Sequence, residues 1–252
     1  MLSKQRHLQI LQMLKEKDSI TLQEIKDRLH ISESTIRRDL NTLDEQGLLV
    51  KVFGGAIVPQ AKNNVLTKDD TVSLREEVHK EEKIRIARYA AGLVSEGDFV
   101  YLDAGTTTGS MIPYLPVNGV TYVTDSVSHA KLLAQRGASV RIIGGEVKAT
   151  TEALVGSEAY MNLKMFHFTL GFFGSNGIDL ETGFTTPDIN EALIKQCAME
   201  HSRKCYVLCD ASKFDQISSV TFGGFETAFI ITGDLHNEAY QQCENIIRAP
   251  KE

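Results

Sequence analysis

A short segment after an apolar run, YLDAGTTTGS at residues 101–110, concentrates groups that can bind an anion. Its carboxylate accepts hydrogen bonds from hydroxyls, its first glycine leaves backbone amides accessible, and its threonines add hydroxyls. Amides and hydroxyls at the start of a helix bind phosphate. We therefore predict a phosphate cradle, although a threonine here can also simply cap the following helix. The candidate residues are Asp103, Gly105, Thr106, Thr107 and Thr108.

Further polar or glycine-rich segments follow later apolar runs in the same way. Because ligands bind at the carboxyl ends of the strands of a parallel sheet, we expect these segments to share one pocket. They are Thr124, Asp125 and Ser126; Gly144 and Gly145; and Gly174, Asn176 and Gly177.

Charged residues later in the chain can complete such a pocket. Glu191 and Lys195 are one helical turn apart and can both face one ligand, and Lys213 can neutralise a phosphate. The simpler alternative is that Glu191 and Lys195 form a surface ion pair and that the glycine pairs are ordinary turns.

A second set of candidates lies in SESTIRRDLNTL, where Ile36, Leu40 and Leu43 define a buried helical stripe. The exposed positions predict contacts with base edges and phosphates of DNA, and Asp39 is expected to orient Arg38 or its neighbours. The alternative is a solvated helix face. The candidates, with the following glycine hairpin, are Ser32, Ser34, Thr35, Arg37, Arg38, Asn41, Lys51, Gly54 and Gly55.

The elements that position the DNA-binding candidates are three short helices and a hairpin within residues 1–58. The first helix has an apolar pattern of His7, Leu8, Leu11 and Leu14, and Thr21 with Glu24 predicts a capping box at the second. Ser32 can cap the third helix and Gly47 can end it. This order predicts a winged helix-turn-helix.

The remainder predicts a second domain. Residues 59–73 are polar and read as a linker, and a single charged helix is expected from Leu74 to Val94. Between 98 and 232, six apolar runs rich in β-formers alternate with helical segments near 107–115, 126–136, 157–164 and 187–202. Residues 74–252 therefore predict an α/β domain with a mostly parallel sheet.

Composition excludes several other classes of protein. The net charge is −6; residues 1–58 contain nine Lys or Arg and eight Asp or Glu, whereas the rest contains eighteen and twenty-five. DNA contact is therefore expected from the first domain alone. No apolar run is long enough to span a membrane, and no signal peptide is evident, so a cytoplasmic protein is expected. The four cysteines, Cys197, Cys205, Cys209 and Cys243, lack metal-ligand spacing, so no metal and no cofactor is predicted.

The chain resembles the DeoR-type family of bacterial transcriptional repressors over nearly its whole length. The resemblance implies a sugar-phosphate sensor domain related to pentose-phosphate isomerases and amino-sugar-phosphate deaminases. The family more often has Asn where this chain has Asp125, and GFTTPD resembles the subgroup that regulates fructose uptake, which implies fructose 1-phosphate as the effector. The matching segments are SESTIRRDLNTLDEQGLL, VFGGA, EKIRIARYAAGLVSEGDFVYLDAGTTT, YVTDS, RIIGG, GSNGID, GFTTPD, EALIKQ and DASKFD.

Three functions are compatible with these residues. The preferred one is a repressor, not an enzyme, that binds operator DNA as a homodimer or homotetramer and is released by a phosphorylated sugar. The second is a sugar-phosphate isomerase or deaminase fused to a DNA-binding domain, with Asp103, Glu191, Asp210 and Lys213 as acid–base groups. The third is a constitutive DNA-binding protein, which would leave the threonine-rich pocket without a purpose.

Overall fold

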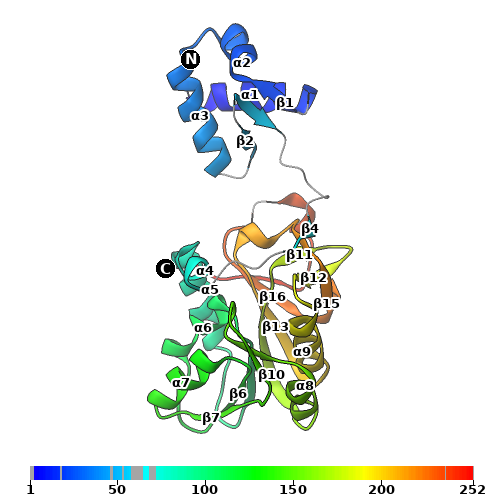
Figure 1. Ribbon diagram of the computed structural model, residues 1–252. Coiled ribbons are helices and arrows are strands. Elements are labelled where there is room, and N and C mark those ends of the chain that lie inside the picture. The colour runs from blue at the N-terminus through cyan, green and yellow to red at the C-terminus, as the bar shows by residue number, and fades with distance from the viewer. Residues whose placement is uncertain are drawn as a thin grey trace. The chain divides into compact units, whose positions relative to one another are not determined.

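The computed structural model describes residues 3–17, 19–45, 48–52, 54–57, 65–67, 72–235 and 237–251. The chain forms two compact units, Met1–Asn63 and Asn64–Glu252 (Figure 1). A helical N-terminal unit and a C-terminal α/β unit with a parallel sheet confirm the predicted fold class. Within the described residues, no helix is long and apolar enough to cross a membrane.

The N-terminal unit combines three helices with a small antiparallel sheet of order β1-β3-β2. The hairpin around Gly54, which has a φ of 87°, is confirmed, and β1 is a third strand that the sequence did not predict. The elements are α1 (Ser3–Lys17), β1 (Ser19–Thr21), α2 (Leu22–Leu29), α3 (Glu33–Glu45), β2 (Val50–Val52) and β3 (Gly55–Ile57).

The stripe predicted for α3 is confirmed, since Ile36, Leu40 and Leu43 are all buried. The capping box of α2 is present as well. The stripe predicted for α1 is wrong at Leu8, which is 68% exposed; Leu14 is buried as predicted and Leu11 packs partly buried against the core, which Ile10 and Met13 complete. Gly47, predicted to end α3, lies outside the described residues.

The C-terminal unit is built on seven parallel strands in the order β17-β16-β13-β10-β5-β6-β7. The six predicted strands are all present, and β17 is an additional edge strand. The strands are β5 (Phe99–Leu102), β6 (Thr121–Thr124), β7 (Ser139–Ile142), β10 (Phe168–Gly174), β13 (Ser202–Leu208), β16 (Phe229–Thr232) and β17 (Ile246–Arg248).

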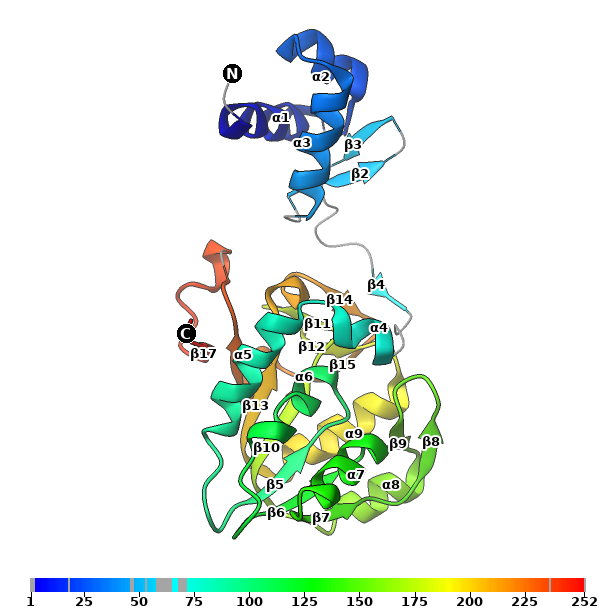
Figure 2. The ribbon, with the colours of Figure 1, turned by 90° about the vertical axis from the view of Figure 1, so that its left-hand side faces the viewer.

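Helices cover both faces of this sheet (Figures 1 and 2). One core joins strand residues to α5 and α7, and the other joins the alternate strand residues to α8 and α9. The helices are α4 (Val72–Glu77), α5 (Lys80–Ala91), α6 (Thr106–Gly109), α7 (Val127–Gln135), α8 (Ser157–Leu163) and α9 (Ile189–Glu200), with 3₁₀ turns η1 (Ile112–Tyr114), η2 (Ala211–Lys213), η3 (Phe225–Thr227) and η4 (Glu238–Tyr240).

The remaining strands form smaller sheets. One is an antiparallel sheet of β11, β12 and β15, one is the hairpin of β8 and β9, and β4 pairs in parallel with β14. Thus β4 and the start of α4 lie in the range expected as a linker. The strands are β4 (Val65–Leu66), β8 (Glu146–Lys148), β9 (Ala153–Val155), β11 (Gly177–Asp179), β12 (Gly183–Thr186), β14 (Ile217–Ser218) and β15 (Val220–Gly223).

The prediction of a single helix over 74–94 is wrong, because the segment forms two helices, α4 and α5, with a non-helical turn between them. His79 has a φ of 54°, in the left-handed region that cannot continue an α-helix. Val78, His79 and Lys80 are all exposed, so no buried side chain holds this segment in helical register.

The strand order places a crevice between β5 and β10. From β5 the chain adds β6 and β7 on one side and then crosses to add β10, β13, β16 and β17 on the other. Such a change of direction leaves the carboxyl ends of the two central strands open to a ligand.

Candidate ligand cavity and nucleic-acid interface

A cavity of about 310 Å³ lies at this crevice. Its walls are the loops after β5 and β10, the end of β13, the inner face of α9, and side chains of α4, α5 and η2. Eight predicted residues line it, namely Gly105, Thr106, Thr107, Gly174, Asn176, Glu191, Lys195 and Lys213.

The other predicted ligand residues have different places. Asp103 and Thr108 are buried just behind the cavity wall, Thr124 and Asp125 are buried in the domain, and Ser126 lines a neighbouring cavity. Gly144 and Gly145 line neither cavity, and Gly177 lies in β11. Of the four loops that were expected to share one pocket, the loops after β5 and β10 line this cavity, and the predicted residues after β6 and β7 do not.

The floor of the cavity is held by a buried ion pair between Asp103 and Lys195. The side chains are 1% and 9% exposed, and Asp103 Oδ2 also accepts a hydrogen bond of 2.8 Å from the Gly174 N–H. Burial lowers the pKa of Lys195, but the charges of Asp103 and Glu191 outweigh burial and raise it overall. Lys195 therefore stays protonated, and it joins the ends of β5 and β10.

Asp125 lies behind this pair. Burial, together with the nearby charge of Asp103, raises the pKa of Asp125 well above its usual value. A raised pKa favours the protonated carboxyl group, which has a donor and an acceptor, as an asparagine side chain has.

Glu191 is engaged by the β8–β9 hairpin. Thr151 Oγ1 donates to Glu191 Oε1 at 2.5 Å, and Lys148 Nζ lies 3.2 Å from the same oxygen. Lys148 also pairs with Asp188, which caps α9. Among the described residues no ion pair joins Glu191 to Lys195, so the simple surface pair considered above is not formed.

Three further cations, from α4, α5 and η2, line the cavity. Lys213 lines it, and its ammonium group forms no hydrogen bond or ion pair with any described residue. Arg75 and Lys83, which the sequence did not single out, also line it. Lys83 Nζ donates to the Arg75 carbonyl and, at 3.3 Å, to Thr106 Oγ1, and burial lowers its pKa.

The three threonines of α6 have separate roles. Thr108 is fully buried, and its hydroxyl donates to the carbonyls of Asp103 and Gly105. It is therefore a structural residue that shapes the loop. Thr106 and Thr107 line the cavity, and the first N–H groups of a helix have no intrahelical acceptor.

A second cavity of about 330 Å³ shares Arg75 and residues 104–106 with the first. It is lined by serines, by Tyr114 and by His129. Burial lowers the pKa of His129 to about 4, so its imidazole is neutral.

In the N-terminal unit, most DNA-binding candidates are exposed together on and beside α3. Ser32 Oγ accepts from the Thr35 N–H at 3.3 Å, which confirms the predicted cap. Ser32, Ser34, Arg37, Arg38, Asn41, Lys51 and Gly54 are exposed and Thr35 is half-buried. Gly55 is buried against β1, where a Cβ would lie 2.0 Å from the Ile20 carbonyl oxygen.

Two polar contacts set the shape of this surface. Lys51 Nζ donates to Asn41 Oδ1 at 2.5 Å and so joins β2 to α3, and Arg37 pairs with Glu33 at 2.5 Å one turn earlier. Asp39 does not orient Arg38 but is buried and accepts from Arg6 of α1 at 2.6 and 2.9 Å.

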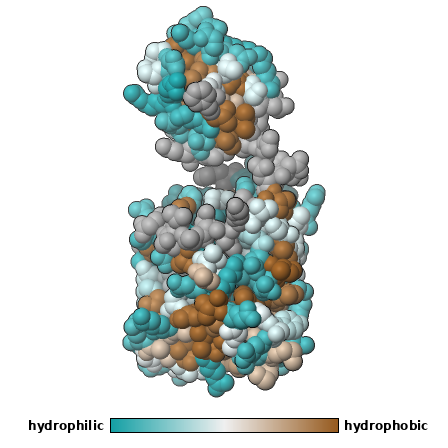
Figure 3. Space-filling view, in the orientation of Figure 1, coloured by the Kyte–Doolittle hydropathy of each residue, from teal (hydrophilic) through white to brown (hydrophobic). Residues whose placement is uncertain are grey.

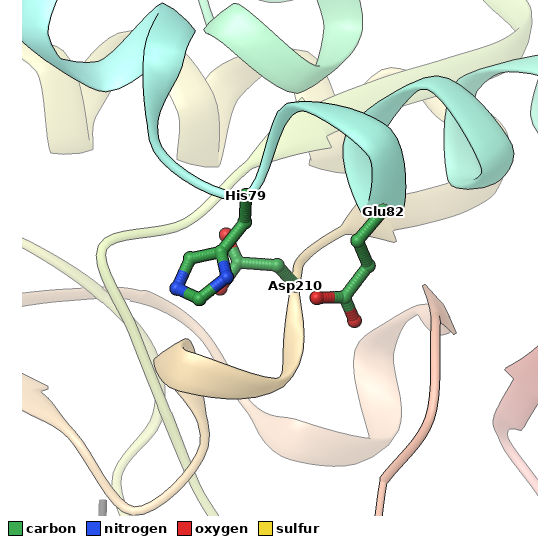
Figure 4. Close-up of side chains that lie close together, drawn as sticks. All are labelled: His79, Glu82 and Asp210. Atoms are coloured by element: carbon green, nitrogen blue, oxygen red, sulfur yellow. The ribbon is translucent and has the colours of Figure 1, made fainter. Parts of the chain in front are cut away.

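The described residues also bring together potential metal ligands that no sequence pattern had grouped. One donor atom each from His79, Glu82 and Asp210 lie within 4.8 Å of one another (Figure 4). All four cysteines are free thiols, and burial raises the pKa of Cys205 to about 11 and of Cys209 to about 12.

Comparison with known proteins gives consistent matches over both units. The family model of the DeoR-like helix-turn-helix domain matches residues 6–62, and that of the DeoR C terminal sensor domain matches residues 78–234. A Bacillus subtilis (strain 168) protein described as the uncharacterized HTH-type transcriptional regulator FruR is 40% identical over 97% of this chain and 96% of its own length. The glycerol-3-phosphate regulon repressor of Escherichia coli (strain K12) is 29% identical over 87% of this chain and 86% of its own. Among solved structures, the match to ribose 5-phosphate isomerase A of Methanocaldococcus jannaschii covers 54% of this chain and 54% of the isomerase chain, with a TM-score of 0.41 and 17% identity.

Proposed function

Because this chain belongs to the DeoR family and is a transcriptional repressor rather than an enzyme, we propose that a phosphorylated sugar in the β5–β10 cavity releases it from operator DNA. The ligand would favour an arrangement of the protein that binds the operator less well. The regulated genes would serve carbohydrate utilisation.

The observation that carries this proposal is the cationic side of the cavity. The ammonium group of Lys213 has no hydrogen-bond or ion-pair partner among the described residues, and Lys213 lines the same cavity as Arg75, Lys83 and the first turn of α6. An uncompensated ammonium beside helix N–H groups is suited to a phosphate. Lys195, Glu191 and Asn176 on the other walls offer donors and acceptors for sugar hydroxyls.

We propose fructose 1-phosphate as the effector. The GFTTPD segment, which contains the whole of β12 and the residue that caps α9, resembles the fructose-regulating subgroup, and the relative named FruR is consistent with that subgroup. The glycerol-3-phosphate repressor, a more distant relative, supports a phosphorylated ligand in general.

The test is a thermal-shift screen with fructose 1-phosphate, other sugar phosphates and inorganic phosphate, followed by operator binding measured by fluorescence anisotropy. A bound ligand stabilises the folded protein by mass action. Lys213→Met should weaken ligand binding and leave operator affinity unchanged. The matched control is Lys131→Met, which changes an exposed lysine of α7. Equal ligand binding by both variants would contradict the proposal that Lys213 contacts the phosphate.

DNA binding is proposed through Arg37, Arg38 and the residues around them. One arginine can reach a base edge while the other contacts phosphate, because adjacent positions on a helix differ by about 100°. Arg37 would exchange its Glu33 partner for DNA, since both side chains are more than half exposed.

A homodimer or homotetramer is proposed because helix-turn-helix regulators bind paired half-sites. Large apolar side chains are exposed on the C-terminal unit (Figure 3), and Ile189 and Leu193, 54% and 45% exposed, lie one turn apart on α9. Replacing both by Glu should lower the mass measured by light scattering if a second copy packs there, and an unchanged mass would exclude this face.

The isomerase alternative has a direct test as well. The protein should return fructose 1-phosphate and ribose 5-phosphate unchanged over hours in a ³¹P NMR assay. Turnover that Lys195→Met abolishes would show residual catalysis.

A further inference from the structure

We propose that His79, Glu82 and Asp210 form a binding site for one divalent transition-metal ion of the Mn²⁺ or Zn²⁺ type beside the ligand cavity. His79 and Glu82 lie three residues apart at the start of α5, and Asp210 follows β13 and caps η2 (Figure 4).

The spacing of the donor atoms fits an ion placed between them. The atoms lie within 4.8 Å of one another, yet the imidazole of His79 forms no hydrogen bond or ion pair with either carboxylate. Neighbouring ligands of a tetrahedral zinc ion with bonds of about 2.1 Å are about 3.4 Å apart. The donor atoms of the cluster are at most 4.8 Å apart, so the side chains need to approach one another by at most about 1.4 Å to hold a metal.

Each carboxylate has one oxygen fixed and the other available. Asp210 is 1% exposed, and its Oδ1 accepts from the Ser212 N–H and hydroxyl. Glu82 Oε1 accepts from the Ala211 N–H at 3.2 Å. Asp210 Oδ2 and Glu82 Oε2 have no hydrogen-bond partner among the described residues. Hydrogen bonds that orient carboxylate ligands in this way are typical of metal sites.

Neither carboxylate forms an ion pair with a basic side chain within the part of the chain that the structure describes, although the charges of Arg85 and Lys83 act on Glu82 and Asp210 at longer range. Arg85, one turn after Glu82, pairs with Asp234, and Lys83 points to the Arg75 carbonyl and Thr106. Burial and the neighbouring charge of Asp210 raise the pKa of Glu82. An almost fully buried unpaired carboxylate beside a second acid is costly, and a cation between them removes that cost.

The donor set indicates the class of ion. One imidazole nitrogen with two carboxylate oxygens suits Mn²⁺, Fe²⁺ or Zn²⁺, whereas Mg²⁺ and Ca²⁺ prefer oxygen ligands alone. Three protein ligands leave positions for water or for an oxygen of a ligand in the adjoining cavity, which Asp210 also lines.

The test uses the full chain after chelator treatment, with Mn²⁺ binding measured by the loss of the free-ion EPR signal and with thermal shifts in Mn²⁺, Zn²⁺ and Mg²⁺. We expect one saturable Mn²⁺ site, stabilisation by Mn²⁺ and Zn²⁺, and little effect of Mg²⁺. His79→Ala, which keeps a β-carbon at this left-handed position, and Asp210→Asn, which keeps the turn of η2, should each weaken Mn²⁺ binding about tenfold or more.

Matched controls separate this site from adventitious binding. Glu81→Gln changes the exposed acid next to Glu82, and His167→Ala removes an exposed histidine whose ring stacks on His201. Both controls should bind Mn²⁺ as the unaltered protein does. Absence of a saturable site, or equal binding by His79→Ala and Asp210→Asn, would overturn the proposal. Neither result would affect the proposed sugar-phosphate function, which the phosphate screen tests separately.

Discussion

Lys195→Met should destabilise the C-terminal unit strongly, because it leaves the carboxylate of Asp103 buried without its counterion. The methionine keeps most of the side-chain volume, so the loss reports on charge rather than on a cavity. Asp103 is 1% exposed, and only the Gly174 N–H would remain as its side-chain partner.

The expected loss can be bounded from these contacts. Removing one partner of a buried ion pair costs about 3–5 kcal/mol. The retained N–H bond contributes about 1.5 kcal/mol or more, which places the loss toward the lower end of that range. We therefore expect a loss of about 3 kcal/mol at pH 7, largely recovered in Lys195→Met with Asp103→Asn.

The assay follows from the tyrosine distribution. The chain has seven tyrosines and no tryptophan, and every tyrosine lies between residues 89 and 240. Urea unfolding followed by tyrosine fluorescence therefore reports on the C-terminal unit alone. A loss below about 1 kcal/mol, the range of exposed ion pairs, would refute the argument that this pair is desolvated. Failure of the double variant to recover would place the cost in packing instead.

Three further predictions concern other parts of the chain. Arg37→Ala should weaken specific operator binding by about 1–3 kcal/mol, and an unchanged footprint would refute its role. Gly145→Ala should destabilise the C-terminal unit by more than about 1 kcal/mol in urea unfolding, because φ is 127° and a Cβ would lie 2.6 Å from the Val155 carbonyl oxygen. Unfolded His129 takes up a proton as the pH falls from about 6.5 to about 4, whereas the buried imidazole does not. Stability should therefore fall by about 3 kcal/mol over this window, and His129→Asn should abolish that slope.

The fold was predictable where hydrophobic periodicity was strong. The buried stripe of α3 and the six apolar strands were identified because the period of a helix or the length of an apolar run fixes the element type. The break at His79 was not, because the charges of α4 and α5 continue smoothly across it and only the backbone shows the left-handed residue.

The site residues that were predictable are those in loops that directly follow strands, because such loops lie at the carboxyl edge of a parallel sheet. Sequence order placed the loops after β5 and β10 at one edge, but their pairing as neighbours depends on the crossover from β7 to β10, which no local pattern contains. For the same reason the approach of Lys195 to Asp103, and of Arg75 to the cavity, could not be read from spacing. For Asp39 the sequence neighbourhood was misleading. It suggested the adjacent Arg38 as the partner, whereas the actual partner, Arg6, lies 33 residues away on α1.

The pairing of β4 with β14 determines where this chain can be cut and rejoined. Val65 and Leu66 pair with Ile217 and Ser218, so the sensing module begins before the helix that carries Arg75. A chimera that joins a foreign DNA-binding head at residue 74 would discard this strand and most of the first turn of α4. A junction upstream of Val65 would instead transfer the whole ligand-binding module, so heads and sensors should be exchangeable only at that earlier point.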